Sequence, residues 1–330
     1  MASLTGALRR RVLTPDISET TLETRGFHDK GPAGRSVLET VGASFLAGLG
    51  DAVETASPER TDARLTALST RYQGFAYEGA AMGFALLDAL SFRGGRTRRF
   101  LDGPGAPHVY MAYVGIGWAM ARLPKPLWPG TGDLDPVLRW LVHDGYGFHQ
   151  AYFHTEAHVH RRERATGAAR RTGDGAYALR AADQGIGRAL WFVAGTDAER
   201  AAALVETFPR ERRQDLYAGL GLAATYAGGA DEEELDALCE RAGEHRWFLA
   251  QGSAFAAEAR VRAGLVVPHT ETATRVLCSL DAEKAARLSR DHRPDASAGP
   301  APSPDRPWYE IWRVSVAEEF AHRGGAGGLS

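Results

Sequence analysis

Residues 184–187 read Gln-Gly-Ile-Gly and interrupt a stretch that is otherwise apolar at helical spacing. A glycine followed two residues later by glycine or alanine occurs six times in this helical context, and we call each occurrence a glycine signature. The signatures are Glu78-Gly79-Ala80-Ala81, Val114-Gly115-Ile116-Gly117, Asp144-Gly145-Tyr146-Gly147, Gln184-Gly185-Ile186-Gly187, Ala218-Gly219-Leu220-Gly221 and Gln251-Gly252-Ser253-Ala254. Their first glycines are 36, 30, 40, 34 and 33 residues apart. This period is typical of helix–turn–helix repeats. The sequence therefore predicts an all-α fold of stacked helical hairpins, an α/α superhelical or toroid-like array.

Glycines inside helices need a physical reason. Each one costs about 1 kcal/mol relative to alanine, so a Gly-x-Gly pair costs about twice that. Close helix–helix approach compensates for this cost, because a missing Cβ lets a neighbouring helix pack against the backbone. A glycine-rich phosphate loop would need a strand before the glycines, and no alternating pattern precedes them. The signatures therefore predict sites of helix packing.

We expect one all-α domain over residues 1–330, divided into four segments. Residues 1–60 form an N-terminal irregular and helical segment, and residues 61–291 form the helical hairpins. A Pro/Ala/Ser-rich linker occupies residues 292–307, and a capping helix occupies residues 308–322.

Composition excludes several classes of protein. Hydrophobic residues make up 44% and charged residues 24% of the chain, which is ordinary for a globular protein. The net charge of −2 gives no reason to expect binding to nucleic acid. No apolar run reaches the roughly 18–20 residues of a membrane span. Cys239 and Cys278 are expected to be free thiols in a reducing cytoplasm.

The residue before the first glycine of each signature is polar in four of six cases: Glu78, Asp144, Gln184 and Gln251. Equivalent positions in stacked repeats line up on one face. These side chains therefore line either a shared chamber or a solvated rim. Arg188, one turn after Gln184, is placed to neutralise Glu78 or Asp144.

Five of the eleven histidines fall between positions 143 and 160. His154 and His158 are four residues apart, a helical spacing that lets both imidazoles reach one metal ion. Residue 155 is Thr rather than the Glu of a zinc-protease motif, and arginines follow at positions 161 and 162. The two histidines are thus weak metal candidates, the alternative being a polar helix end, and no cofactor is predicted. His149 lies in an aromatic helix, where burial tunes an imidazole for acid–base chemistry.

Other catalytic patterns are missing from the sequence. The nearest approach to a Gly-x-Ser-x-Gly elbow, residues 251–255, lies within a predicted helix. Dinucleotide and phosphate-loop fingerprints, and the aspartate motifs of terpene cyclases, do not occur.

Several longer phrases resemble a known family. They are Gly74-Phe75-Ala76-Tyr77-Glu78-Gly79-Ala80-Ala81-Met82, Asp144-Gly145-Tyr146-Gly147-Phe148-His149, Gly185-Ile186-Gly187-Arg188-Ala189-Leu190-Trp191-Phe192, the stretch from Gly219 to Gly229, and the stretch from Ala250 to Ala256. Together they resemble an actinobacterial family of unknown function encoded in the core cassette of enediyne gene clusters, beside the iterative polyketide synthase. The resemblance runs from about residue 10 to residue 315. It implies a role in maturing a linear polyene into an enediyne core, and it brings no catalytic residues with it.

The leading hypothesis is an enzyme, or a subunit of one, that acts on a hydrophobic polyene or polyyne. Glu78, Asp144 and His149 would transfer protons, and Arg188 would orient a carboxylate or stabilise negative charge. The expected substrate-binding residues are Tyr77, Tyr113, Trp118, Tyr146, Phe148, Tyr152, Gln184, Trp191 and Gln251. One alternative is a non-catalytic scaffold or chaperone for other enzymes of the pathway, and a further alternative is an isoprenoid cyclase without the usual motifs.

Overall fold

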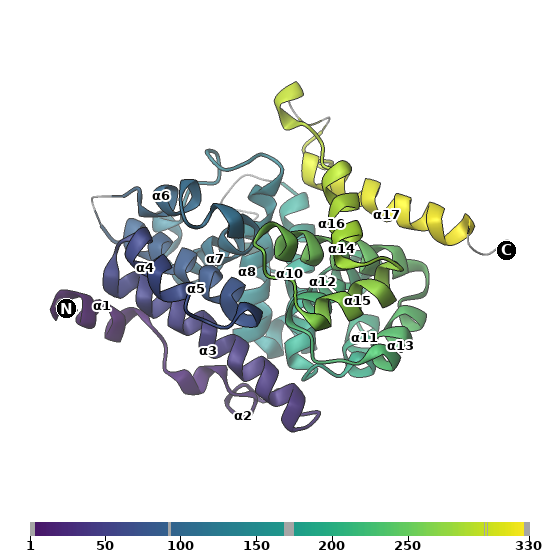
Figure 1. The fold of residues 1–330 in the computed structure, drawn as a ribbon, viewed down its shortest axis with the longest axis horizontal. Coiled ribbons are helices and arrows are strands. Elements are labelled where there is room, and N and C mark those ends of the chain that lie inside the picture. Colours follow the sequence, from purple (N-terminus) through teal and green to yellow (C-terminus); the bar gives the residue numbers. More distant parts are fainter. Residues whose placement is uncertain (1–3, 92–93, 168–174, 300, 302, 327–330) are drawn as a thin grey trace.

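The computed structural model describes residues 4–91, 94–167, 175–299, 301 and 303–326. Within these residues every extended regular element is a helix, and one isolated bridge joins Ser303 to Arg306. The all-α prediction is therefore confirmed. Seven helices pack side by side in one curved row, which runs from α3 through α8 and α10 to α14 (Figure 1). These are α3 (Pro32–Thr55), α5 (Thr70–Ala89), α7 (Val109–Arg122), α8 (Leu141–Phe153), α10 (Tyr177–Val193), α12 (Arg210–Ala227) and α14 (Arg246–Arg262).

Shorter helices connect or flank the members of the row. They are α1 (Leu4–Leu13), α2 (Leu22–Arg25), α4 (Pro58–Leu65), α6 (Arg96–Asp102), α11 (Ala198–Glu206), α13 (Glu232–Ala242), α15 (Pro268–Cys278) and α16 (Ala282–Asp291). Five of them begin at side chains that cap the helix N-terminus: Thr21, Ser57, Asp197, Asp231 and Asp281. Cys239 on α13 and Cys278 on α15 are both free, as expected.

The glycine signatures lie at the contacts within the row. The first glycine of each signature packs against the previous helix of the row. It contacts the carbonyl of the residue that precedes the first glycine in that helix's own signature. A Cβ at Gly185 would lie 1.8 Å from the Asp144 oxygen, and one at Gly219 would lie 1.9 Å from the Gln184 oxygen. Real Cβ atoms do not come this close to a carbonyl. Glycine is therefore required where each pair of backbones meets.

The second glycine packs on the following helix. A Cβ at Gly187 would lie 2.1 Å from the Leu216 oxygen, and one at Gly221 would lie 2.1 Å from the Leu249 oxygen. Residues two apart in a helix point about 200° away from each other. One Gly-x-Gly pair therefore serves two neighbours on opposite sides of its helix, which explains why the signature contains two small residues.

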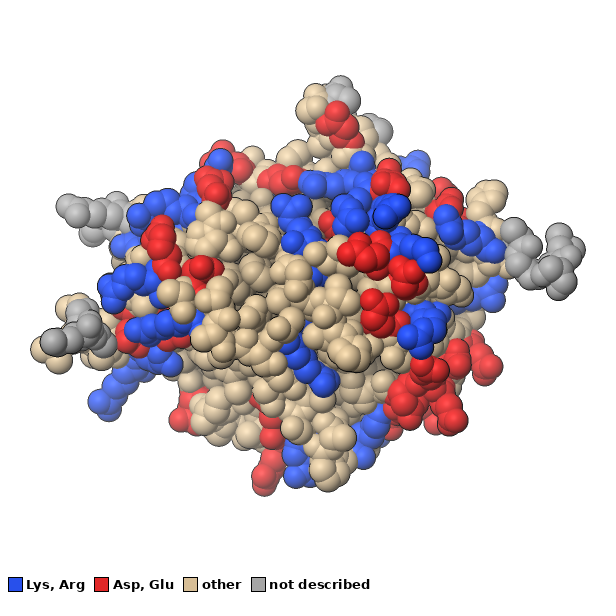
Figure 2. Space-filling model, in the orientation of Figure 1, with Lys and Arg blue, Asp and Glu red and all other residues tan. Residues whose placement is uncertain are grey.

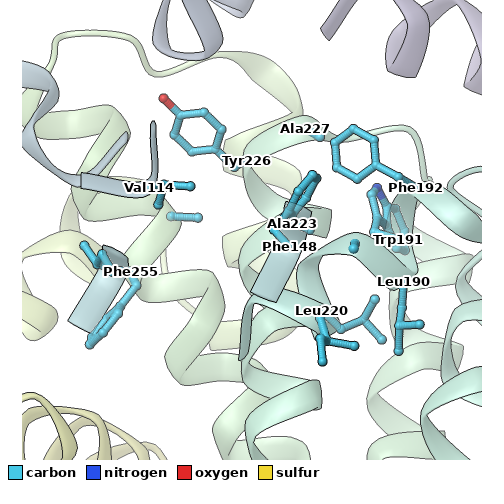
Figure 3. Close-up of a cluster of buried hydrophobic side chains, with 14 of the residues drawn as sticks. Val114, Phe148, Leu190, Trp191, Phe192, Leu220, Ala223, Tyr226, Ala227 and Phe255 are labelled. Atoms are coloured by element: carbon cyan, nitrogen blue, oxygen red, sulfur yellow. The ribbon is translucent and has the colours of Figure 1, made fainter. Parts of the chain in front are cut away.

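Neighbouring helices of the row run in the same direction. Near the starts of α8 and α10, the rings of Trp140 and Tyr177 lie 4.9 Å apart, and near their ends the rings of Tyr152 and Phe192 lie 6.1 Å apart. Parallel neighbours in a constant register present equivalent positions to the same side. The row therefore has a single inner face, where side chains of α7, α8, α10, α12 and α14 meet (Figure 3).

Helix α3 is the first member of the row, although it lies in the N-terminal segment, outside the residues 61–291 that were expected to form the helical hairpins. Gly48 packs on the Ala76 carbonyl of α5, and Gly79 packs on the Phe45 carbonyl of α3. The same two contacts thus recur with a single glycine on the α3 side. By length and composition alone, α3 could cross a membrane. The sequence had not suggested this, because α3 contains no long uninterrupted apolar run. In this fold, however, it packs along α5 as part of the core.

The row bends back on itself, so that distant segments meet. The His28 amide donates a hydrogen bond to the Val193 carbonyl at 3.0 Å, and Lys30 pairs with Glu234. Across the interior, the Tyr110 hydroxyl donates to Glu258 at 3.3 Å. The start of α3 therefore lies against the loops that follow α10 and α12, and α7 approaches α14.

The C-terminal helix α17 (Trp308–Ala326) closes one end of the interior. Its Tyr309, Trp312 and Arg313 are fully buried, and the Trp312 ring lies 4.1 Å from that of Phe255. It extends four residues beyond the expected end of the capping helix. In the linker, residues 292–307, the described residues form one short 3₁₀ turn, Ala296–Ala298, and the Ser303–Arg306 bridge. On the face shown in Figure 2, charges of both signs are interspersed around a largely uncharged centre.

Candidate functional site

The inner face of the row is defined by positions four residues apart on each helix. On each helix the inner face starts at the residue before the first glycine. It continues with the residues four and eight positions later, which lie on the same side of the helix. On α8 these residues are Asp144, Phe148 and Tyr152, and on α10 they are Gln184, Arg188 and Phe192. All six are buried. Glu78 and Gln251 are also buried, which rules out the solvated rim.

A cavity of about 490 Å³ lies between these inner faces and the N-terminal segment, a volume suited to a small molecule. At its mouth, Asp16 and His154 are exposed, whereas Glu78 and Arg188 at its floor are buried. Its walls are mainly aromatic and aliphatic. They are formed by Val41, Phe45, Leu46, Leu49, Phe75, Met82, Trp118, Phe148, Tyr152, Phe153 and Phe192.

Arg188 is held at the floor by a buried ion pair. Its Nη1 donates to Asp144 Oδ1, and its guanidinium lies 5.1 Å from the centre of the Phe148 ring. Gln184 Nε2 donates to Asp144 Oδ2 at 2.8 Å and to the Tyr309 hydroxyl at 2.9 Å. Asp144 itself lines a second space of about 20 Å³ behind the main cavity. The charge of Arg188 is therefore already balanced before a ligand binds.

Glu78 is a neutral carboxylic acid at neutral pH. Burial raises its pKa to about 8, the Arg188 charge opposes this rise, and the Asp144 charge adds to it. The neighbouring Trp118 indole also favours the charged form slightly. A protonated carboxyl group therefore faces an aromatic cavity, and this is a feature of sites that donate protons.

His149 is a neutral imidazole on the cavity wall. Burial lowers its pKa to about 3, and the neighbouring His154 and Arg122 charges lower it further. Its ring meets the edge of Trp118 with centroids 5.4 Å apart. Because a base with so low a pKa binds protons weakly, His149 is a poor proton acceptor despite its position. The sequence-based role of His149 in proton transfer is therefore not favoured by its surroundings.

We predict that Glu78 makes stability depend on pH. Between pH 4.5 and 8 the unfolded state loses the Glu78 proton while the folded state keeps it, so stability falls as the pH rises through this window. Glu78→Gln removes this penalty. Relative to the native protein, the variant should gain about 3–4 kcal/mol in free energy of unfolding from pH 5 to pH 8. Urea denaturation at several pH values measures this gain. Glu233→Gln, at an exposed position, is the control, and a constant difference for Glu78→Gln would contradict the prediction.

Six of the predicted site residues line the cavity: Glu78, Trp118, Phe148, His149, Tyr152 and Arg188. Asp144 and Gln184 support the floor from behind, as described above. Gln251 accepts a hydrogen bond from Arg313 of α17 at 3.3 Å instead of facing the cavity. The structure thus brings the expected charged residues together, but it leaves Asp144 and Gln251 outside the main space.

Four predicted substrate-binding residues point elsewhere. Tyr77 stacks on His108 at 3.5 Å and donates to Asp62. Tyr77, Tyr113 and Trp191 are offset from the nearest inner-face position by one residue, or about 100° on a helix, and Tyr146 is offset by two residues, or about 200°. The other three are Tyr113, whose hydroxyl accepts from the Asp135 amide at 3.1 Å, Tyr146, which packs on Trp128, and Trp191, which donates to the Gly228 carbonyl at 3.0 Å.

The two weak metal candidates do not lie in one continuous α-helix. Helix α8 ends at Phe153, His154 has non-helical dihedrals, and a π-helical turn covers Glu156–His160. His158 Nδ1 lies 3.0 Å from the Glu163 carbonyl oxygen. The His158 amide still donates to the His154 carbonyl at 3.0 Å, so a single helical turn joins the two residues at the end of α8. Among the described residues, no three His, Cys, Asp or Glu side chains are grouped to hold a metal ion.

Sequence reasoning missed part of the cavity wall. Met82, Arg122 and Phe192 lie on the inner face, four or eight residues after the start of a signature, so helical spacing alone could have identified them. Pro15, Glu19 and Thr20 at the mouth carry no such signal.

The fold and the site define a class of protein: a curved row of parallel, glycine-packed helices around a cavity of small-molecule size. The model of a family described as "Protein of unknown function (DUF1702)" matches residues 4–320, and the chain belongs to this family. No curated protein and no solved structure matches the chain.

Proposed function

We propose that the protein is an enzyme that binds a hydrophobic linear polyene or polyyne and rearranges it by proton transfer. The observation that carries this proposal is the neutral Glu78 carboxyl group at the floor of an aromatic cavity. A flat unsaturated chain suits walls built from aromatic faces. The reaction class is isomerisation or cyclisation, which needs no redox cofactor.

The proposed chemistry uses Glu78 twice. Its carboxyl proton is transferred to one carbon of a double bond and leaves an allylic cation, which nearby aromatic faces stabilise. The Glu78 carboxylate, paired electrostatically with Arg188, then removes a proton from another carbon and restores the acid. With a pKa of about 8 against about 3 for His149, Glu78 is the stronger base by about five orders of magnitude. Protons and electrons balance over the cycle.

The biological setting is proposed from the resemblance to the enediyne-cassette family. Its phrases contain Glu78, Met82, Phe148, His149 and Arg188, all of which line the cavity. We therefore place the protein in the cytoplasm, where it matures the polyene of an enediyne-type polyketide beside other enzymes of the pathway. An isoprenoid diphosphate fits this site less well, because the Arg188 charge is already matched by Asp144.

A scaffold for pathway enzymes is the second candidate function. Its support is a stripe on α1, where Leu4, Leu8 and Val12 follow at intervals of four residues and are 92%, 61% and 69% exposed. The concave side of the row encloses the cavity described above. A docked enzyme would therefore use the α1 stripe.

One experiment tests the proposal and separates the two functions. The protein is incubated with the polyene released by its cognate synthase, and the products are followed by chromatography and mass spectrometry. Glu78→Gln should retain binding and lose about a hundredfold in conversion rate, whereas Glu233→Gln should be unaffected. Native conversion by Glu78→Gln would contradict the enzyme proposal. Loss of pathway output only in Leu8→Glu would favour the scaffold.

A further inference from the structure

An arginine at the mouth of the cavity has no acidic partner among the described residues. Arg122, in the last turn of α7, lines the cavity, and its Nη1 donates to the Leu13 carbonyl at 3.2 Å. This bond uses one of the five N–H donors of the guanidinium group. Solvent reaches Arg122 from one side, yet the surrounding protein desolvates it enough to lower its pKa, and no described acidic group opposes this shift. The cation is therefore partly removed from water without a counter-charge.

The acidic side chains at the mouth have partners of their own. Asp16 Oδ1 accepts a hydrogen bond from the Ser18 amide at 2.9 Å. Glu19 pairs with Arg25 at 2.8 Å. Neither carboxylate raises the pKa of Arg122, as a nearby negative charge would do. The positive charge of Arg122 is therefore available to a ligand.

Two imidazoles lie on the same side of the mouth as Arg122. The charges of Arg122 and His154 both lower the pKa of His149, and the rings of the two histidines lie 6.4 Å apart. Because such electrostatic effects weaken with distance, the three side chains lie near one another. The wall beyond them is mainly aromatic and aliphatic. A cation at the entrance to an apolar cavity matches a molecule with an apolar chain and an anionic end.

We infer that the ligand is an unsaturated carboxylic acid whose carboxylate pairs with Arg122 at the mouth, while its apolar chain extends along the aromatic wall toward Glu78. This inference rests on the proposed function in taking the cavity as the ligand site. A carboxylate fits the planar guanidinium fork and carries a single negative charge. A diphosphate carries more charge, which Asp16 and Glu19 at the same mouth would repel. The role of orienting a carboxylate, expected for Arg188, thus belongs to Arg122. Proton transfer then falls on a double bond remote from the carboxyl end.

Parinaric acid and its methyl ester provide probes with one polyene chain and different charges. Each is titrated into the full-length protein by its own fluorescence at about pH 7, where the acid is ionised. We expect the acid to bind about tenfold more tightly than the ester, the contribution of one hydrogen bond between charged groups. Because the mouth is open to solvent, this preference should fall at about 1 M salt. Geranylgeranyl diphosphate, added as a competitor, should bind more weakly than the acid.

Substitutions locate the effect. Arg122→Met should abolish the preference for the acid, while the affinity for the ester is kept, which shows that the cavity is intact. Arg122→Lys keeps the charge and should retain part of the preference. Arg287→Met, which removes an exposed arginine of α16 that does not line the cavity, should keep all of it.

Four results would overturn the inference. They are equal affinity of the native protein for acid and ester, failure of both probes to bind, tighter binding of the diphosphate than of the acid, and an unchanged preference in Arg122→Met. If Arg122→Met does not fold, the salt dependence of the native protein and the affinities of Arg122→Lys decide the matter.

The result is distinguishable from failure of the proposed function. Glu78→Gln should bind both probes with the native preference, because Glu78 lies at the floor and the anchoring charge at the mouth. If the preference is present but the polyene is not converted, only the proton-transfer proposal fails. If the polyene is converted but the preference is missing, only the carboxylate anchor fails.

Discussion

Replacing Gly221 with alanine should lower the free energy of unfolding by about 3 kcal/mol or more, although alanine is the better helix former. The new Cβ would lie 2.1 Å from the Leu249 carbonyl oxygen and 2.9 Å from its carbon. Both atoms belong to the backbone, so helices α12 and α14 must separate to relieve the clash. The intrinsic gain of about 1 kcal/mol from alanine is too small to offset this.

Urea or thermal denaturation followed by circular dichroism measures the change. Gly132→Ala is the matched control, because Gly132 is exposed and a Cβ there meets no atom within 4 Å. The control should be within about 0.5 kcal/mol of the native protein. If Gly221→Ala is as stable as Gly132→Ala, the glycine signatures do not hold the row together.

Arg188→Met should destabilise the fold by about 3–5 kcal/mol. It removes the cation that pairs with Asp144 and leaves a carboxylate that is fully buried. Gln184 still donates one hydrogen bond to this carboxylate, but one amide does not replace the lost charge. Adding Asp144→Asn to Arg188→Met should therefore restore about 2 kcal/mol, as a double-mutant cycle would measure.

The control for this prediction is an ion pair of the same type on the surface. Arg210 donates to Glu244 at 2.9 Å with both side chains exposed, so Arg210→Met should cost less than about 1 kcal/mol. Comparable losses for Arg188→Met and Arg210→Met would show that the floor of the cavity is well solvated. The cavity would then not hold Glu78 in its neutral form.

The row of helices could be predicted because each contact between neighbouring helices depends on a short sequence pattern that recurs in every repeat. Gly115 on α7 and Gly185 on α10 are both recognisable in the sequence, because each packs against a backbone carbonyl of the previous helix and leaves no space for a Cβ. Helix α3 was not predicted as a member of the row because Leu46 lies where the signatures have their first glycine. Only Gly48 remained as a signal there, and a lone glycine in an apolar helix is not specific.

The charged residues of the site were predicted more accurately than the aromatic residues of its wall. Glu78 and Arg188 both lie on the inner face, Glu78 just before the first glycine of its signature and Arg188 one helical turn after the corresponding Gln184. Tyr77 was predicted to bind substrate because it is next to Glu78 in the sequence. One residue along a helix, however, rotates the side chain by about 100°, so Tyr77 faces away from the cavity. The hydrogen bond from Gln184 to the Tyr309 hydroxyl involves helix α17, which lies more than a hundred residues away in the sequence. No local pattern reports such a contact.

Backbone packing between the helices has a consequence for substitutions at inward positions. Where main chains meet directly, the scaffold does not depend on which side chains project inward from it. Exchanges at Met82, Trp118 or Phe148 can therefore reshape the enclosed compartment while the architecture stays the same. Substitutions at such inward positions should therefore change the size and polarity of the cavity while the backbone contacts at the glycines keep the helices in place.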